Sequence, residues 1–346
     1  MNTSLSTAPG AARPARSKWR RIALGVLGAL VLAGLVFFAG PRNAFGPNAP
    51  TARPMPPQAL GELDGWLKTS EQAFVDIRPG TAKGIVWNGV PGQRTPWAVV
   101  YLHGFTASRL ETAPVAEKVA QALGANVFYT RLAGHGRSSE AMGEASVQDW
   151  LADATEALRI GQSLGERVLV ISCSTGSTLA SWLALTPEGA QVAAHVFISP
   201  NFGPKDKRTE IINGPWGQQI VGLIQGDSVG QPSDDLRENQ AWTKRYPTRA
   251  LFPMMALVKS VRESDLPAFK TPLLLLYSER DQTVDPELTK AAFARIGSPL
   301  KTLEAVNYSK SQGQHVLAGD IRAPEATAPM AASIVKWVTA LPAAAR

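Results

Sequence analysis

The chain has 346 residues, of which 45% are hydrophobic and 18% charged, and its mean hydropathy is close to zero. This composition describes a globular protein and excludes wholesale disorder, a collagen-like repeat and a polytopic membrane protein. The net charge of +7 arises in residues 1–60, which hold seven bases and no acid, so residues 61–346 carry 28 bases and 28 acids. A folded domain without net charge lacks the excess of positive charge that binds a phosphate backbone, which excludes nucleic acid as a partner.

An uncharged, apolar stretch at residues 22–39 follows a basic run that includes Lys18, Arg20 and Arg21. As a helix it would be about 27 Å long, close to the hydrocarbon thickness of a bilayer. We therefore expect a basic cytoplasmic segment at 1–21 and a transmembrane anchor at 22–40, with the rest of the chain non-cytoplasmic, or periplasmic in a bacterium. A cleaved signal peptide and secretion are the alternative, although the bond after Ala39 or Gly40 is a poor cleavage site.

Residues 41–59 are rich in proline, with Asn, Ala and Gly between the prolines. Such a composition does not build a packed core and favours an extended chain. We expect a linker here that acts as a spacer, followed by one folded domain at 60–346.

Beyond residue 60, short apolar runs alternate with helical patterns, which predicts a mostly parallel sheet with helices on both faces. The expected strands are 98–102, 127–130, 168–172, 196–199, 273–277 and 301–305, preceded by two weaker ones at 73–77 and 84–87 that would start the sheet in antiparallel orientation. The expected helices are 112–122, 147–164, 176–185, 286–296 and 326–341.

Residues 201–270 interrupt this alternation and contain several aromatic and methionine side chains without a clear buried strand. We interpret them as a helical insertion. These large side chains are either its own core or the lining of an apolar pocket above an active site. The candidates for the pocket are Trp216, Phe252, Met254 and Met255.

The predicted strand 168–172 runs directly into Ser172-Cys173-Ser174-Thr175-Gly176 and then into a helix of small residues. A strand, a sharp turn and a helix with serine at the turn is the nucleophile elbow of the G-x-S-x-G type, with Ser172 in place of the first glycine. This geometry exposes a weak nucleophile to a base and to a carbonyl group. The alternative is an ordinary serine-rich helix cap.

Two further motifs accompany the elbow: His103-Gly104-Phe105 ends the strand 98–102, and Gly134-His135-Gly136 follows the next strand. With these motifs the chain resembles the α/β-hydrolase superfamily, and within it the branch of monoacylglycerol lipases, carboxylesterases and serine aminopeptidases, over about residues 70–340. The resemblance implies an α/β-hydrolase fold with a helical cap insertion. It also implies the order nucleophile, acid, histidine along the chain.

That order selects His315 as the base, because His103 and His135 come before Ser174 and His195 comes before any candidate acid. A surface-loop histidine is the alternative for His315. Asp281 stands at the position that matches the acid loop of the superfamily. Asp285 is the alternative acid, but it precedes Pro286, and we expect it to cap the next helix.

The resemblance implies a serine hydrolase in which His315 accepts the Ser174 proton, Asp281 orients the imidazole, and the backbone N–H groups of Phe105 and Thr175 bind the oxyanion. Cys173 is the single cysteine, so no internal disulfide or cysteine metal cluster is possible, and we interpret it as a packing residue. No metal or organic cofactor is indicated. We expect a monomer bound to the membrane through its N-terminal helix.

The expected substrates are short-chain or medium-chain carboxylic esters, including monoacylglycerols. A serine aminopeptidase and a thioester, amide or lactone hydrolase are alternatives, as is a non-catalytic, membrane-tethered binding protein. An aminopeptidase would need a carboxylate to hold the substrate amine. The insertion offers Glu210, Asp227, Asp234, Asp235 and Glu238 for that role.

Overall fold

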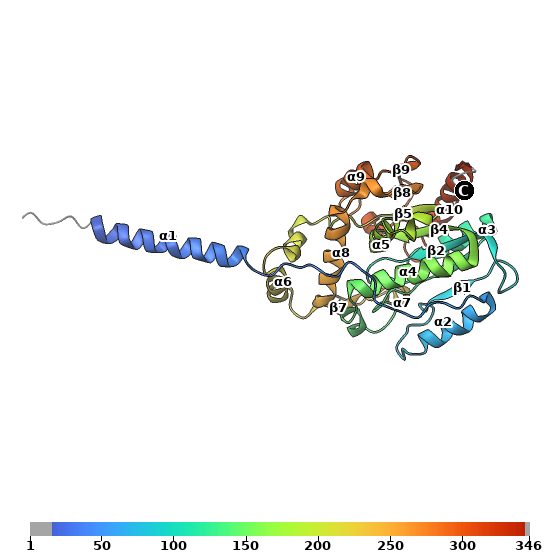
Figure 1. Cartoon of the computed structure of the whole chain (residues 1–346), viewed down its shortest axis with the longest axis horizontal. Helices are drawn as coiled ribbons and strands as arrows, with labels where there is room; N and C mark the ends of the chain where they lie inside the picture. Colours follow the sequence, from blue (N-terminus) through green and yellow to red (C-terminus); the bar gives the residue numbers. More distant parts are fainter. Residues whose placement is uncertain (1–15, 343–346) are drawn as a thin grey trace, which may run out of the picture.

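The computed structural model describes residues 16–342 and consists of one long N-terminal helix followed by a globular domain (Figure 1). The helix, α1 (Arg16–Phe38), points away from the domain. Its 21 residues Lys18–Phe38 are long and apolar enough to cross a membrane, and none of them is buried against the domain. A signal sequence near the N-terminus meets the same criteria of length and composition, so these criteria fit both a membrane anchor and a signal sequence.

The domain is built on a seven-stranded sheet in the order β1-β3-β2-β4-β5-β8-β9. Only β1 is antiparallel to its neighbour, which confirms the predicted mostly parallel sheet and the weak strand at 84–87. The strands are β1 (Gly84–Val86), β2 (Thr95–Leu102), β3 (Asn126–Tyr129), β4 (Gly165–Cys173), β5 (Ala194–Ile198), β8 (Leu273–Tyr277) and β9 (Lys301–Ala305).

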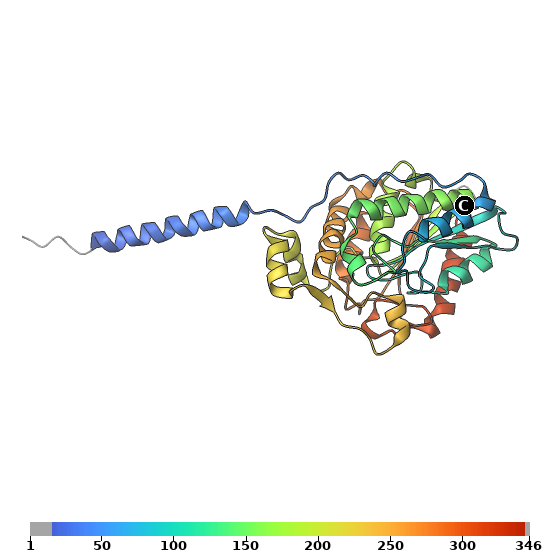
Figure 2. The ribbon, with the colours of Figure 1, turned by 90° about the horizontal axis from the view of Figure 1, so that it is seen from below.

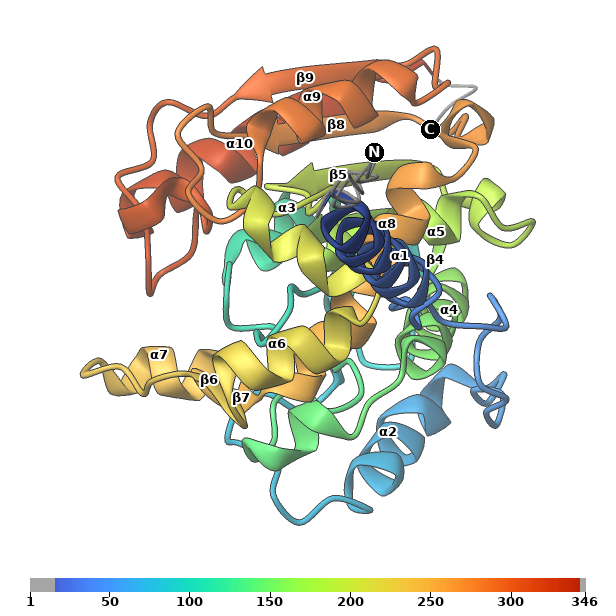
Figure 3. The same ribbon diagram turned by 90° about the vertical axis from the view of Figure 1, so that its left-hand side faces the viewer.

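Helices cover both faces of this sheet, as predicted (Figure 3). The side chains of β2 alternate between the two faces: Val99 and Tyr101 face one apolar core, while Val100 and Leu102 face the other. The first core is closed by α3 (Val115–Leu123) and α10 (Pro324–Ala340). The second is closed by α2 (Leu63–Glu71), α4 (Val147–Leu164), α5 (Thr175–Ala184), α8 (Leu251–Glu263) and α9 (Pro286–Arg295).

Between β5 and β8 the chain forms mainly helices, together with a small antiparallel pair of strands that the sequence analysis did not predict. The strands β6 and β7 have only three residues each, too few for an alternating pattern to be recognised. The elements of this segment are a 3₁₀ helix (Lys207–Asn213), α6 (Gly217–Gln225), β6 (Ser228–Gly230), α7 (Leu236–Ala241), β7 (Arg245–Pro247), a 3₁₀ turn (Thr248–Ala250), α8 and a 3₁₀ turn (Leu266–Ala268). The remaining 3₁₀ helices are Leu60–Glu62, Glu140–Gly143, Gly189–Gln191 and Gln312–Gln314.

The prediction of a strand at 73–77 was wrong. This segment forms turns at the surface of the domain. Val75 is fully exposed, and the Phe74 ring is covered by the guanidinium groups of Arg131 and Arg137, at 4.8 and 4.4 Å from its centroid. The short apolar run therefore has cationic rather than apolar neighbours. The helix α2 just before it was not predicted, although Leu63 and Leu67 lie buried on its inner side.

The proline-rich segment 41–59 has no helix and runs along the surface of the domain (Figure 2). Near its start, the Pro41 carbonyl accepts the Trp216 N–H at 2.8 Å, and the buried Asn43 side chain donates to the Phe252 carbonyl at 2.8 Å. Further along, the Thr51 N–H donates to the Gln148 carbonyl, and Arg53 forms an ion pair with the buried Asp153. The expected spacer is thus extended but bound to the domain at several points.

Candidate active site

Ser174 lies at the turn between β4 and α5, with φ 51° and ψ −119°. A positive φ is costly for a residue other than glycine and persists only where the surroundings enforce it. Here the Ser174 N–H donates to the Ile198 carbonyl at 2.9 Å. Gly176 allows the helix to approach the sheet, because a Cβ atom there would lie 2.1 Å from the Leu102 carbonyl oxygen. The strand-turn-helix sequence therefore folds into a strained elbow with serine at its apex.

Ser172 replaces the first glycine of the elbow motif without leaving an unsatisfied hydroxyl. It is fully buried, and its Oγ lies 3.0 Å from Ser177 Oγ and 3.3 Å from the Val196 carbonyl oxygen. A small polar side chain is tolerated there because these two partners satisfy it.

His315 lies between Ser174 and Asp281. Its Nε2 is 3.0 Å from Ser174 Oγ, and its Nδ1 is 2.8 Å from Asp281 Oδ2. The Asp281 side chain is buried, and its other oxygen, Oδ1, accepts the backbone N–H groups of Thr283 at 2.8 Å and Val284 at 3.0 Å. These bonds fix the carboxylate, which in turn fixes the plane of the imidazole.

The loop that carries His315 is tied to the loop that carries Asp281. The Gln282 N–H donates to the Gly313 carbonyl at 2.9 Å, and Gln314 Oε1 lies 3.2 Å from Ser278 Oγ. Gly313 and Gln314 both adopt a positive φ, of 74° and 54°. Sequence reasoning missed this role of Gln314, because nothing in the local pattern indicates which loop it meets.

Asp285, the alternative acid, has a different partner. Its side chain accepts the Glu287 N–H at 3.0 Å and forms the N-cap of α9. The cap satisfies a helix donor that would otherwise be unpaired, as the sequence analysis expected for this residue.

The other three histidines are fully or almost fully buried, and burial keeps them neutral. It lowers the pKa of His103 to about 4 and that of His195 to about 3, and it holds the pKa of His135 well below its ordinary value. His103 has a structural role: its Nε2 accepts the Leu132 N–H at 3.1 Å, so its Nδ1 carries the proton and donates to the Gly104 carbonyl at 2.9 Å. Burial also raises the pKa of the Cys173 thiol, which makes it a poor nucleophile.

Phe105 and Thr175 line the same cavity as Ser174. In the part of the chain that the structure describes, neither of these two N–H groups donates to another protein group. Two amide donors without a protein partner, on residues that line the cavity of Ser174, are suited to bind an oxyanion.

Glu111 holds the turn that carries Phe105 in place. Its Oε1 accepts the Gly104 N–H at 2.7 Å and the Tyr101 hydroxyl at 2.9 Å. Burial raises the pKa of Glu111 to about 7, although these two hydrogen bonds act in the opposite direction. The sequence analysis did not identify this buried carboxyl, because Glu111 meets the Gly104 N–H only in the folded turn.

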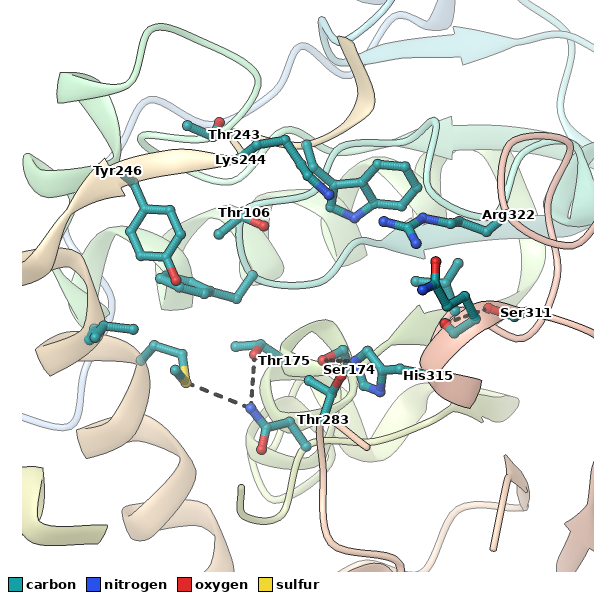
Figure 4. A pocket seen from close by; sticks show the side chains of 17 residues that line it. Thr106, Ser174, Thr175, Thr243, Lys244, Tyr246, Thr283, Ser311, His315 and Arg322 are labelled. Atoms are coloured by element: carbon teal, nitrogen blue, oxygen red, sulfur yellow. Dashed lines mark hydrogen bonds between the residues drawn. The ribbon is translucent and has the colours of Figure 1, made fainter. Parts of the chain in front are cut away.

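A cavity of about 400 Å³ opens above Ser174 (Figure 4). Tyr246 lies at one end, with Phe105 beside it at 5.4 Å between ring centroids. Arg322 lies at the other end, the Lys244 side chain starts near Tyr246 and runs toward Arg322, and His315 lies nearer to Arg322 than to Tyr246 in this view. The complete lining is Phe105, Thr106, Ser174, Thr175, Asn201, Trp242, Thr243, Lys244, Tyr246, Leu251, Met254, Thr283, Ser311, Gln312, His315, Val316 and Arg322.

Of the four expected pocket residues, Met254 lines this cavity and the other three do not. Trp216 begins α6 and packs against Gly40, where a Cβ atom would lie 2.1 Å from the indole Nε1. Met255 is buried in the core between α8 and the sheet, and Phe252 is packed at the edge of that core. Because α8 turns about 100° per residue, its neighbouring side chains cannot share one face with Met254.

Comparisons with known proteins agree with this architecture. A family model described as serine aminopeptidase, S33, matches residues 93–310, which is more than half of the chain and includes Ser174 and Asp281. A thermostable monoacylglycerol lipase of Bacillus sp. (strain H-257) is 25% identical over 216 residues, which cover 60% of this chain and 80% of the lipase.

Two solved structures illustrate the similarity in fold. One comes from work on LipS and LipT, two metagenome-derived lipolytic enzymes; it has a TM-score of 0.60 at 21% identity and covers 76% of this chain and 99% of its own. The other is a soluble variant of monoglyceride lipase from Saccharomyces cerevisiae, with a TM-score of 0.56 at 13% identity, covering 74% and 90%. At these identities the two structures establish the α/β-hydrolase fold of the domain.

Proposed function

The chain belongs to the serine aminopeptidase S33 family of α/β-hydrolases, and we propose that it hydrolyses carboxylic esters through a Ser174 acyl-enzyme. The observation that carries the proposal is the chain of two short contacts, 3.0 Å from Ser174 Oγ to His315 Nε2 and 2.8 Å from His315 Nδ1 to Asp281 Oδ2. A hydroxyl, an imidazole and a carboxylate in this order form the machinery of acyl transfer.

In this mechanism Ser174 Oγ attacks the ester carbonyl while His315 Nε2 takes its proton. Asp281 holds the proton on Nδ1 and stabilises the imidazolium. The tetrahedral oxyanion accepts hydrogen bonds from the N–H groups of Phe105 and Thr175. These donors stabilise the negative charge as it develops on the oxygen. His315 then protonates the leaving alcohol, and water, deprotonated by the same imidazole, releases the acid from Ser174.

The cavity supports an ester rather than a peptide with a free amino terminus. No carboxylate lines it among the residues that the structure describes, whereas Lys244 and Arg322 do. A substrate ammonium would therefore meet two cations, which is unfavourable. The acids considered for amine binding, Glu210, Asp227, Asp234, Asp235 and Glu238, are all absent from the cavity wall.

Cavity size and lining favour a short or medium acyl chain. About 400 Å³ is at the small end of the range of roughly 300–1,000 Å³ for small-molecule sites. The lining residues Phe105, Tyr246, Leu251 and Met254 provide an apolar surface for that chain.

The test is Ser174→Ala, with Ser181→Ala as the matched control. Ser181 is a buried serine in α5, the helix that follows Ser174. Its hydroxyl donates to the Ser177 carbonyl at 2.8 Å, and the residue does not line the cavity. Hydrolysis of p-nitrophenyl esters and labelling by a fluorophosphonate should both be lost in Ser174→Ala and kept in Ser181→Ala. Wild-type protein that neither hydrolyses esters nor becomes labelled would instead support a binding protein, and preferred turnover of thioesters or aminoacyl amides would move the activity to those classes.

We further propose that α1 is an uncleaved membrane anchor with the catalytic domain on the non-cytoplasmic side. The uncharged residues 22–38 of α1 are about 26 Å long as a helix, and the basic residues Lys18, Arg20 and Arg21 precede them. An alkaline phosphatase fusion after Ala52 should be active, and the mature protein should remain in the membrane fraction with its N-terminus intact. A soluble product that starts beyond residue 39 would identify a cleaved signal, and an inactive fusion would reverse the orientation.

A further inference from the structure

Two cations stand at one end of the catalytic cavity, and the proposed ester hydrolysis does not require them. Lys244 comes from the chain just before β7, and Arg322 comes from the segment between His315 and α10. Both side chains line the cavity and both are 24% exposed, so they are partly withdrawn from water. Partly desolvated charges interact more strongly with a ligand than surface charges do.

A single carboxylate faces both cations from outside the cavity. Glu238 Oε2 lies 3.0 Å from Lys244 Nζ, and Oε1 lies 2.7 Å from Arg322 Nε without the angle of a hydrogen bond. In residues 16–342 no other carboxylate is within 4.0 Å of either cation. The cluster therefore carries one net positive charge.

The hydrogen-bond donors of the two cations also exceed what Glu238 can accept. A guanidinium has five N–H donors and an ammonium has three, whereas Glu238 accepts one hydrogen bond from Lys244 and none from Arg322 Nε. Arg322 is held in position by Trp242, whose ring centroid lies 5.5 Å from Cζ. The remaining donors belong to two side chains that line the cavity, where an oxyanion can accept their hydrogen bonds.

The position of His315 assigns this end of the cavity to the leaving group. The imidazole must reach the oxygen of the departing alcohol to protonate it. In Figure 4 His315 lies nearer to Arg322 than to Tyr246, and its neighbour Val316 packs against the cluster that contains Trp242, the ring beside Arg322. The acyl chain therefore fits the Tyr246 end, and the alcohol part of the ester points toward Lys244 and Arg322.

We propose, on the basis of the ester hydrolysis proposed above, that the alcohol of the natural substrate carries an anionic group, a carboxylate or a phosphate, bound by Arg322 and Lys244. Water adds its hydroxyl to the acyl carbon, and its hydrogen ends on the alcohol oxygen, so the products are a fatty acid and an anionic alcohol. An ester of a neutral polyol would leave the extra donors without a partner. An ester of a cationic alcohol would be repelled.

The experiment compares butyrate esters that share one acyl group and differ in the alcohol: glycolate for the carboxylate arm, 2-hydroxyethyl phosphate for the phosphate arm, and glycolamide as the neutral reference. Each kcat/KM is divided by the rate of hydroxide-catalysed hydrolysis of the same ester, which removes intrinsic reactivity. For the wild-type full-length protein we expect at least one anionic ester to exceed the neutral one by about tenfold or more. The preferred arm identifies the anion.

Three variants separate recognition from structure. Arg322→Met and Lys244→Gln should each lower the anionic-to-neutral ratio several-fold, whereas Glu238→Gln should raise it by freeing both cations. If the cluster only joined α7 to the chain near Arg322, all three would change thermal stability and leave the ratio unchanged. Arg237→Gln is the control, because this exposed arginine pairs with Asp235 and does not line the cavity.

The outcomes distinguish this proposal from the one on which it rests. Turnover of the neutral ester without preference for either anionic ester, or a ratio that Arg322→Met and Lys244→Gln both leave unchanged, overturns the anionic site alone. Absence of turnover for all three esters overturns ester hydrolysis itself. Added salt should lower the wild-type ratio, which provides a measurement that requires no variant.

Discussion

Asp281→Asn replaces one oxygen of the proposed triad by an NH2 group, and the structure predicts which one. Asp281 Oδ1 accepts two backbone N–H groups, from Thr283 and Val284, at 2.8 and 3.0 Å. An NH2 group there would face two donors, so the amide oxygen of the variant must keep this position. The NH2 group is then directed at His315 Nδ1, which is 2.8 Å from Oδ2 in the native protein.

This orientation reverses the tautomer of the imidazole. A donor directed at Nδ1 requires that Nδ1 be the acceptor, so the proton moves to Nε2. Nε2 lies 3.0 Å from Ser174 Oγ and can then no longer take the serine proton. The same change in a Ser-His-Asp protease lowers kcat about 10⁴-fold with its geometry intact, and we expect a similar loss, about 5.4 kcal/mol of barrier.

The assay is hydrolysis of p-nitrophenyl butyrate, with thermal unfolding measured in parallel. Asp285→Asn is the matched control, because Asp285 caps α9 through the Glu287 N–H and asparagine is a comparable N-cap residue. It should keep activity within about threefold of the wild type and change the free energy of unfolding by no more than about 1 kcal/mol. If Asp281→Asn kept more than about a tenth of the activity, or if Asp285→Asn lost more than Asp281→Asn, the carboxylate would have been assigned wrongly.

Two further predictions concern buried carboxyls. Burial raises the pKa of Glu111 from 4.5 to about 7. Between pH 4.5 and 7 the folded state therefore binds more protons than the unfolded state. The free energy of unfolding consequently falls as pH rises through this range. Glu111→Gln should flatten this fall between pH 5 and 8 in urea titrations, and an undiminished fall would contradict the assignment. Arg53→Met removes the ion-pair partner of Asp153, which is 2% exposed, and should cost about 1–2 kcal/mol at pH 7 by the same titration, because burial raises the pKa of Asp153 to about 6 and the carboxyl can bind a proton when its cation is lost. A loss below about 0.5 kcal/mol would mean that Asp153 does not depend on the linker.

Regular elements of the fold were predictable where local signals agree. The helix α4 has the predicted bounds because Ser146 and Asp149 form a capping box in front of a long apolar periodicity. The strands β8 and β9 also have the predicted bounds. Each is a segment of five residues that is followed directly by a loop or turn. The run at 73–77 shows the limit of this reasoning, because side-chain composition does not reveal whether Phe74 meets an apolar core or two guanidinium groups.

The candidate catalytic residues were predictable for a different reason. The elbow around Ser174 is a local motif, and the order of the chain leaves His315 as the single histidine after it with an acid between. Lys244 and Arg322 carry no such signal. They are far apart in the sequence, and only the fold brings both to Glu238 and to one end of the cavity.

The linker connects the anchor to the active site through a continuous series of contacts. Arg53 pairs with Asp153, whose Oδ2 accepts the Ala133 N–H at 2.6 Å. The Ala133 carbonyl in turn accepts the Trp150 indole N–H at 2.9 Å, and the Trp150 ring packs against Phe105 with their centroids 6.2 Å apart. Phe105 is the residue whose backbone N–H is proposed to bind the oxyanion. A domain cut at residue 60 would therefore lose the counterion at one end of this series, whereas a domain cut at residue 40 would keep every contact in it.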